Sequence, residues 1–145
     1  MAEASVAPRP MSVTLEQVGA AAFAAEAASG GTVVIDGAPA IGGEGRGMRP
    51  MELLLTAIAS CSAMDVVSIL RKQREPLEHL RIEIEGARAD STPSPFTRVR
   101  IVFVARGSVD EHKLRRAVSL SVEKYCSVRA TMSGDVDVQW DARLE

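Results

Sequence analysis

The chain of 145 residues, 46% hydrophobic and 25% charged, has the length and composition of one globular domain that can bury a core. Its formal net charge of -2 excludes the basic surplus typical of proteins that mainly bind nucleic acid or anionic membranes. We therefore expect a small molecule or a protein as the partner, with no nucleic acid and no membrane.

The N-terminal segment, residues 1–10 (MAEASVAPRP), lacks the basic start and the long apolar run of a signal peptide. We interpret it as a flexible tail that precedes a single domain over residues 11–145. Without an export signal, we expect the protein to be cytoplasmic.

Next in chain order, short strands are predicted around Val13 and Leu15 and over residues 32–36 (TVVID), which are rich in β-branched side chains. Residues 20–28 (AAAFAAEAA) between them are ambiguous, because alanine favours a helix while the position favours an arm of a hairpin. A loop rich in glycine and proline follows, over residues 37–50.

Residues 52–72 (ELLLTAIASCSAMDVVSILRK), which follow Pro50 and end in two cations, are predicted to form a helix about 30 Å long. Glu52 and Asp65 argue against a membrane span, because a charge in lipid costs about 2.5 kcal/mol or more. We therefore expect a helix buried in protein nearly all round. One small subunit cannot easily surround such a helix, so a second subunit is expected to cover part of it.

The C-terminal half combines strands with one more helix. Alternating residues predict strands at residues 81–85, 99–103 and 136–140, with a loop at residues 91–95. Residues 108–126 are predicted to be helical, because Ser108 and Glu111 have the spacing of a capping box and an apolar stripe follows. The residues of that stripe are Leu114, Val118, Val122 and Tyr125, and Cys126 falls in the last turn.

The chain has two cysteines, Cys61 and Cys126, and two histidines, His79 and His112. Cytoplasmic cysteines normally stay reduced, so redox chemistry, metal binding and plain packing are the roles to weigh. No cysteine or histidine has a second ligand at zinc spacing, so no metal site is predicted. Both histidines stand next to charged residues and are expected at the surface.

Three motifs together resemble the OsmC/Ohr family, the osmotically inducible protein C and organic hydroperoxide resistance proteins. They are PMELL at residues 50–54, SCSAMDVV at 60–67 and EKYCSV at 123–128, and the similarity runs from about Val13 to Trp140. The resemblance implies an α+β fold and an intertwined homodimer, in which the long cysteine-bearing helix is central and antiparallel sheets flank it. It also implies a strand around Phe23.

The resemblance further implies thiol peroxidase chemistry in oxidative stress defence. By position, Cys61 attacks an organic hydroperoxide as a thiolate and becomes a sulfenic acid, and Cys126 then condenses with it to a disulfide. A dithiol of the lipoyl type restores both thiols, and no cofactor is needed. Glu52 matches the family's glutamate, which holds an arginine from the N-terminal hairpin.

The chain departs from the family at that arginine. A cysteine in the middle of a helix gains nothing from the helix dipole, so a cation is needed to stabilise its thiolate. The turn where the family carries the arginine contains Gln17, Val18 and Gly19 here, and Arg46 and Arg49 are the nearest substitutes. We therefore expect weaker peroxidase activity than in members that keep the hairpin arginine.

Helix geometry constrains Glu52 as well. At about 100° per residue, Glu52 and Cys61 lie on opposite faces of their helix, roughly 13 Å apart. If the two residues share a site, the partner subunit must supply one of them. Cys61 and Cys126 of one subunit, by contrast, are expected close enough to form a disulfide, which requires Cα atoms within about 7 Å.

The alternative function is a non-catalytic dimer that binds an apolar small molecule at the subunit interface. Under this hypothesis the cysteines are small hydrophobic side chains and Glu52 only complements the helix dipole. For Asp65, one turn after Cys61, we expect a structural hydrogen bond.

Overall fold

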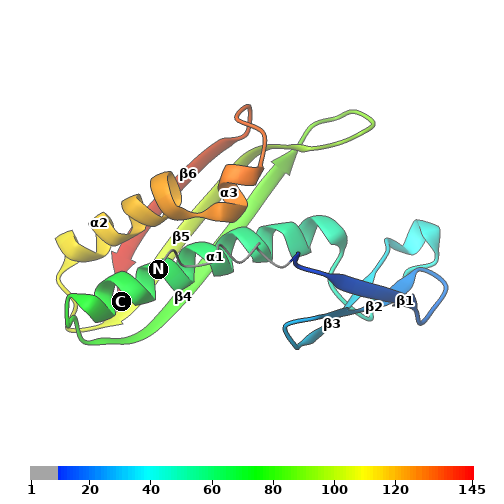
Figure 1. The fold of residues 1–145 in the computed structure, drawn as a ribbon. Coiled ribbons are helices and arrows are strands. Elements are labelled where there is room, and N and C mark those ends of the chain that lie inside the picture. The colour runs from blue at the N-terminus through cyan, green and yellow to red at the C-terminus, as the bar shows by residue number, and fades with distance from the viewer. Residues whose placement is uncertain (1–9) are drawn as a thin grey trace, which may run out of the picture. The chain divides into compact units, whose positions relative to one another are not determined.

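The computed structural model describes residues 10–145, so the predicted tail lies outside the described residues except for Pro10. The chain forms two compact units, one that ends at Leu53 and one over Leu54–Glu145, and each is described by itself. The single domain expected over residues 11–145 stays a prediction. In chain order (Figure 1) the elements are β1 (Val13–Gln17), β2 (Ala22–Ala27), β3 (Thr32–Asp36), the 3-10 turn η1 (Pro39–Ile41), α1 (Pro50–Lys72), β4 (Leu77–Arg88), β5 (Phe96–Gly107), α2 (Glu111–Leu120), the π turn η2 (Ser121–Tyr125), α3 (Ser127–Thr131) and β6 (Asp137–Leu144).

The first unit contains an antiparallel sheet in the order β1-β2-β3, so both strands predicted there are confirmed. The ambiguous residues 20–28 contain the strand β2, which pairs with a neighbour on each side. Those two ladders satisfy its backbone groups and override the helix propensity of alanine. Because side chains alternate along a strand, one face of this sheet is apolar. Its apolar residues are Val13, Leu15, Phe23, Ala25, Ala27, Val33 and Ile35.

The second unit contains the sheet β4-β5-β6, in which β4 and β5 are antiparallel and β6 runs parallel to β5. The three strands predicted from alternation are thereby confirmed, and the predicted α+β class is confirmed with them. Figure 1 shows α2 lying along this sheet, where Arg115 donates to the carbonyl oxygen of Ala142 at 2.7 Å. The buried centre of β5 alternates as Val99, Ile101, Phe103 and Ala105.

Helix α1 ends at Lys72, as the sequence predicts, and begins at Pro50, two residues before the predicted range. Within one chain 22% of its most apolar stretch is buried, so the expected burial nearly all round, with a second subunit covering part of the helix, stays a prediction. Among the described residues it is the one helix with the length and apolar composition to cross a membrane, a test that core helices of soluble proteins also pass. The uncovered apolar surface includes Met64, which is 71% exposed.

The second predicted helix differs from its prediction at both ends. Asp110, not Ser108, caps it, accepting a hydrogen bond from the Lys113 N–H at 2.9 Å. After Leu120 the helix widens into the π turn η2, which alters the angular position of each following residue. Tyr125, expected on the buried stripe, is therefore 50% exposed, although the other three stripe residues are buried.

Candidate functional site

Cys126 lies directly after the π turn, where the backbone is extended, and not in a last helical turn as predicted. Its side chain is 4% exposed. The sulfur accepts a hydrogen bond from the Arg129 N–H at 3.5 Å, because Cys126 is the N-cap of α3. On its other side, the thiol faces the carbonyl oxygen of Ile58 in α1 at 4.0 Å.

Cys61 lies on α1, three residues after Ile58, and is half-buried. Residues three apart are neighbours on a helix surface. The Cys126 thiol, which faces the Ile58 carbonyl oxygen, therefore lies against the part of α1 that carries Cys61. Within one chain the helix-centre thiol of Cys61 is the more exposed and the thiol of Cys126 the more buried. We call residues 58–65 together with residues 121–129 the cysteine region.

A second contact fixes the cysteine region. The hydroxyl of Ser121, which is fully buried, lies 3.0 Å from the carbonyl oxygen of Ser62 and 3.1 Å from a carboxylate oxygen of Asp65. The predicted structural hydrogen bond of Asp65 is thereby confirmed. Because Asp65 and Ser62 flank one turn of α1, this contact sets the register between the π turn and the helix that carries Cys61.

A cavity of about 310 Å³ borders Cys126. Its lining combines the thiol with the cationic residues Lys124 and Arg129 and with apolar residues such as Val138. The guanidinium of Arg129 donates to the Val122 carbonyl oxygen at 2.6 Å. A small molecule in this cavity would lie against the buried cysteine, which nothing in the sequence indicated.

Glu52 stands in the first turn of α1, as its position after Pro50 predicts, and it is exposed. A carboxylate oxygen accepts a hydrogen bond from the backbone N–H of Arg49 at 3.0 Å. This is the helix-side half of a capping box, in which the third helical residue binds the N-cap N–H. Glu52 therefore stabilises the start of α1, whatever further contacts it makes.

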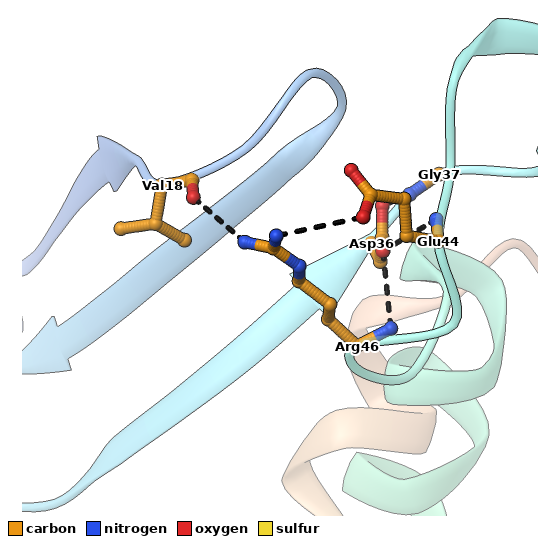
Figure 2. Close-up of polar contacts among 5 residues, drawn as sticks. All are labelled: Val18, Asp36, Gly37, Glu44 and Arg46. Atoms are coloured by element: carbon orange, nitrogen blue, oxygen red, sulfur yellow. Dashed lines mark hydrogen bonds and ion pairs between the residues drawn. The ribbon is translucent and has the colours of Figure 1, made fainter.

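Asp36, at the end of β3, organises the glycine-rich segment that we call the Asp36 loop, residues 37–49. Its carboxylate is 2% exposed and accepts three backbone N–H groups, from Gly37 at 2.8 Å, Glu44 at 2.9 Å and Arg46 at 3.1 Å (Figure 2). The N–H of Glu44, followed by that of Arg46, holds the pKa of Asp36 below its ordinary value of 3.8.

Glycine is needed in the Asp36 loop because the backbone approaches itself closely. A Cβ at Gly43 would collide with the carbonyl group of Gly37, and one at Gly47 would collide with the carbonyl oxygen of Val34. The loop also returns to the sheet, since the N–H of Asp36 donates to the Met48 carbonyl oxygen at 3.0 Å. The loop is therefore fixed by hydrogen bonds along its length.

The Asp36 loop carries Arg46 to the turn between β1 and β2. The Arg46 guanidinium donates to the carbonyl oxygen of Val18 at 3.0 Å and pairs with Glu44 at 3.5 Å (Figure 2). It also lies so close to Gly19 that a Cβ there would stand 3.2 Å from one of its nitrogens. The turn that lacks an arginine in the sequence thus holds a guanidinium from 28 residues further along the chain.

The apolar face of the first unit is open. A hollow of about 400 Å³ lies on it, with an apolar lining that includes Val13, Leu15, Val33 and Leu53. Val13 is 58% exposed and Leu15 is 53% exposed. Surface of this kind on a small sheet is typical of contact with a partner or an apolar ligand.

Within residues 10–145, no group of three or more histidine, cysteine or acidic side chains gathers with the geometry of a metal site. His79 and His112 are both exposed, as predicted. Both cysteines are free. The cysteine region thus presents two free thiols.

Sequence reasoning found the cysteines, Glu52 and Asp65, but it missed Asp36. An aspartate at the end of a strand before a loop rich in glycine is a signal for a carboxylate that binds loop N–H groups, and TVVID followed by GAPAIGG carries it. It also missed Ser62, whose buried hydroxyl has no hydrogen-bond partner among the described protein atoms.

Comparison with known proteins relates the chain to one family. The model of the OsmC-like protein family matches residues 43–141. The chain is 35% identical over 117 residues to Protein YhfA of Escherichia coli K12, covering 80% of this chain and 84% of that protein. A hypothetical protein from Aquifex aeolicus has the same fold, with a TM-score of 0.83 and 34% identity over 95% of this chain and 98% of that one.

A more distant structure shares the fold alone. It is the organic hydroperoxide resistance protein OsmC from Legionella pneumophila, with a TM-score of 0.66 and 16% identity. The match covers 94% of this chain and 98% of that chain.

Proposed function

This chain belongs to the OsmC-like protein family, as its motifs predicted, and from that premise we propose that it reduces organic hydroperoxides with Cys61 and Cys126. The observation that carries the proposal is the position of the Cys126 thiol, 4.0 Å from the Ile58 carbonyl oxygen and thus one helical turn from Cys61. The printed name of the Legionella protein, organic hydroperoxide resistance, supports the same class of substrate and a role in oxidative stress defence.

The proposed reduction of a hydroperoxide has three steps, and atoms and electrons balance in each. The Cys61 thiolate attacks the O–O bond of the hydroperoxide, an S–O bond forms, and the alcohol leaves after taking up a proton. Cys126 then attacks the sulfenic sulfur, the S–O bond breaks, and the oxygen leaves as hydroxide, which is protonated to water. A dithiol of the lipoyl type reduces the Cys61–Cys126 disulfide and becomes a disulfide itself.

A thiolate in the middle of α1 needs a cation, and we assign that role to Arg46. Its guanidinium is held at the turn where the sequence lacks an arginine, by Val18 on one side and Glu44 on the other. The buried carboxylate of Asp36 fixes the backbone of Arg46 and so limits the freedom of the side chain. Glu52 is the companion carboxylate in this proposal, and both act across the dimer.

The homodimer is part of the proposal. Its support is the apolar surface that one chain leaves open, both on α1 and on the face of β1-β2-β3. A second copy would cover these surfaces, as the length and composition of α1 led us to expect. Sedimentation at micromolar concentration tests this, and a monomer would contradict it.

The decisive experiment measures the consumption of an organic hydroperoxide with a dithiol reductant in the parent, Cys61→Ser and Cys126→Ser proteins. We expect turnover to fall to the background rate in Cys61→Ser. In Cys126→Ser, a sulfenic acid should accumulate on Cys61, which mass spectrometry after trapping detects. Equal background rates in all three proteins would reject the enzyme.

The alternative function has one specific observation in its favour, the apolar hollow of about 400 Å³ on the first unit. A non-catalytic dimer would use this surface to bind an apolar small molecule. Binding of an apolar fluorescent probe that is lost in Leu15→Asp, in a protein without hydroperoxide turnover, would favour this function. Probe binding unchanged by the substitution would exclude the hollow as the site.

A further inference from the structure

Ser62 stands out among the buried polar side chains. It is 1% exposed, and its hydroxyl oxygen has no hydrogen-bond partner among the described protein atoms. A buried hydroxyl without a partner loses its hydration without compensation, so its presence calls for a reason. Its neighbour Ser60 shows the ordinary arrangement, since that hydroxyl donates to the Ala57 carbonyl oxygen at 3.2 Å.

Helix geometry places the Ser62 side chain on the face of α1 that carries Ile58, whose carbonyl oxygen the Cys126 sulfur faces. Side chains on an α-helix lean toward its N-terminus, so the hydroxyl of Ser62 lies over the turn that contains Ile58. The Ile58 carbonyl is the usual acceptor for a serine four residues later. In this protein the Cys126 sulfur faces that carbonyl, at 4.0 Å, and the Ser62 hydroxyl makes no bond to it.

The neighbouring polar groups are already engaged. Ser121 directs its hydroxyl to the Ser62 carbonyl oxygen and to the Asp65 carboxylate. The Arg129 N–H donates to the Cys126 sulfur at 3.5 Å. The Ser62 hydroxyl is thus a buried donor on this part of α1 that no described protein atom engages.

Ionisation of Cys126 changes which hydrogen bonds stabilise its sulfur. As a thiol, its S–H group can point at the Ile58 carbonyl oxygen. As a thiolate, the sulfur is repelled by that oxygen and needs hydrogen-bond donors instead, because a buried charge is stabilised by hydrogen bonds to its charged form. The Arg129 N–H provides one such donor.

We propose that the hydroxyl of Ser62 is the second donor, which binds the Cys126 sulfur when it becomes a thiolate and so promotes disulfide formation with Cys61. This role rests on the proposed function, in which Cys126 attacks the Cys61 sulfenic acid. The thiol proton leaves to solvent, the S–S bond forms, the S–O bond breaks, and the departing hydroxide is protonated to water. Ser62 keeps its proton throughout and donates only a hydrogen bond.

The first measurement isolates Cys126 in the Cys61→Ser background, where it is the sole cysteine of the chain. Its rate of reaction with dipyridyl disulfide, a small neutral reagent, is followed against pH in three proteins: this background alone, with Ser62→Ala, and with Ser60→Ala. The cavity of about 310 Å³ that borders Cys126 gives the reagent a route to the sulfur. Ser60→Ala is the matched control, since it removes a satisfied hydroxyl from the other side of position 61.

We expect Ser62→Ala to slow this reaction about tenfold at neutral pH, because a hydrogen bond to a charged group is lost. The difference should vanish at high pH, where the thiolate forms in every protein. Ser60→Ala should follow its background at all pH values. Ser62→Ala should also be no less stable to denaturant than its background, since it removes a buried hydroxyl without a partner, so a slower reaction cannot be assigned to unfolding.

The second measurement uses the chain with both cysteines and an organic hydroperoxide. Ser62→Ala should leave the rate of Cys61 oxidation unchanged and slow the closing of the disulfide, with the sulfenic acid persisting longer. If Cys61 of the parent is not oxidised, the proposed function fails, while the Cys126 rates still decide the role of Ser62. Equal pH profiles for Ser62→Ala and Ser60→Ala would overturn that role.

Discussion

The Asp36 loop and the cysteine region are ordered by different means. In the Asp36 loop, one buried carboxylate accepts three backbone N–H groups, and the exposed Arg46 is placed by hydrogen bonds. In the cysteine region, Ile58 and Val122 are buried, and polar contacts join Ser121 of the π turn to α1 and Arg129 to Cys126. One hydroxyl there, on Ser62, has no partner among the described atoms.

The two regions position a reactive group in different ways: the Asp36 loop positions a cation, and the cysteine region positions a thiol. A cation that stays exposed must be held by directional bonds, because no packing confines its side chain. The Cys126 thiol, which changes its charge in the proposed reaction, is buried and accepts one backbone N–H, while the Ser62 hydroxyl has no partner among the described atoms. We expect substitutions in the two regions to differ in their effects on stability and activity.

The largest effect on stability is expected from Ile58→Ala in the cysteine region. Ile58 is fully buried, so the cavity should lower the free energy of unfolding by about 2–5 kcal/mol. The same change at Ile41, on the Asp36 loop and 71% exposed, should alter it by less than about 0.5 kcal/mol. Denaturant unfolding measures both, and comparable losses would show that the loop, too, depends on apolar packing.

A smaller and pH-dependent effect is expected from Asp36→Asn. The asparagine has one acceptor oxygen and no charge, so it cannot hold the N–H groups of Gly37, Glu44 and Arg46 together, and Tm at neutral pH should fall. Because the folded pKa of Asp36 is lowered, its contribution is complete above the ordinary value of 3.8 and is lost as the pH falls through that value toward the folded pKa.

The difference in Tm between the parent and Asp36→Asn should therefore shrink in acid. Glu44→Gln serves as the control, because its exposed side chain pairs only weakly with Arg46, at 3.5 Å. A difference in Tm that stays constant from neutral pH to below 3.8 would show that the charge of Asp36 does not hold the loop.

Arg46→Ala is expected to have the smallest effect on stability and a larger effect on activity. The guanidinium is about half exposed, so its loss should lower the free energy of unfolding by less than about 1 kcal/mol. Oxidation of Cys61 by an organic hydroperoxide should slow about tenfold or more, since a charged donor to the thiolate is removed. Arg49→Ala is the comparison, and equal slowing in both variants would reject the assignment of Arg46.

Much of the fold was determined by local sequence. The bounds of α1 follow from Pro50 and the terminal cations, and the strands of the second unit follow from strict alternation, because each pattern matches the period of its element. The motifs around Cys61 and Cys126 indicated the family whose model then matched the chain. These features depend on residues close together in the chain.

The rest required the tertiary structure, because it depends on residues far apart in the chain. Alanine-rich β2 is a strand only since it pairs on both sides, and the π turn that sets Tyr125 outward is a departure of one residue that no periodicity predicts. Arg46 reaches Val18 only because Asp36 folds the loop between them. The burial of Cys126 and the unpartnered hydroxyl of Ser62 likewise follow from how α1 meets the π turn, because long-range packing decides which polar groups find partners.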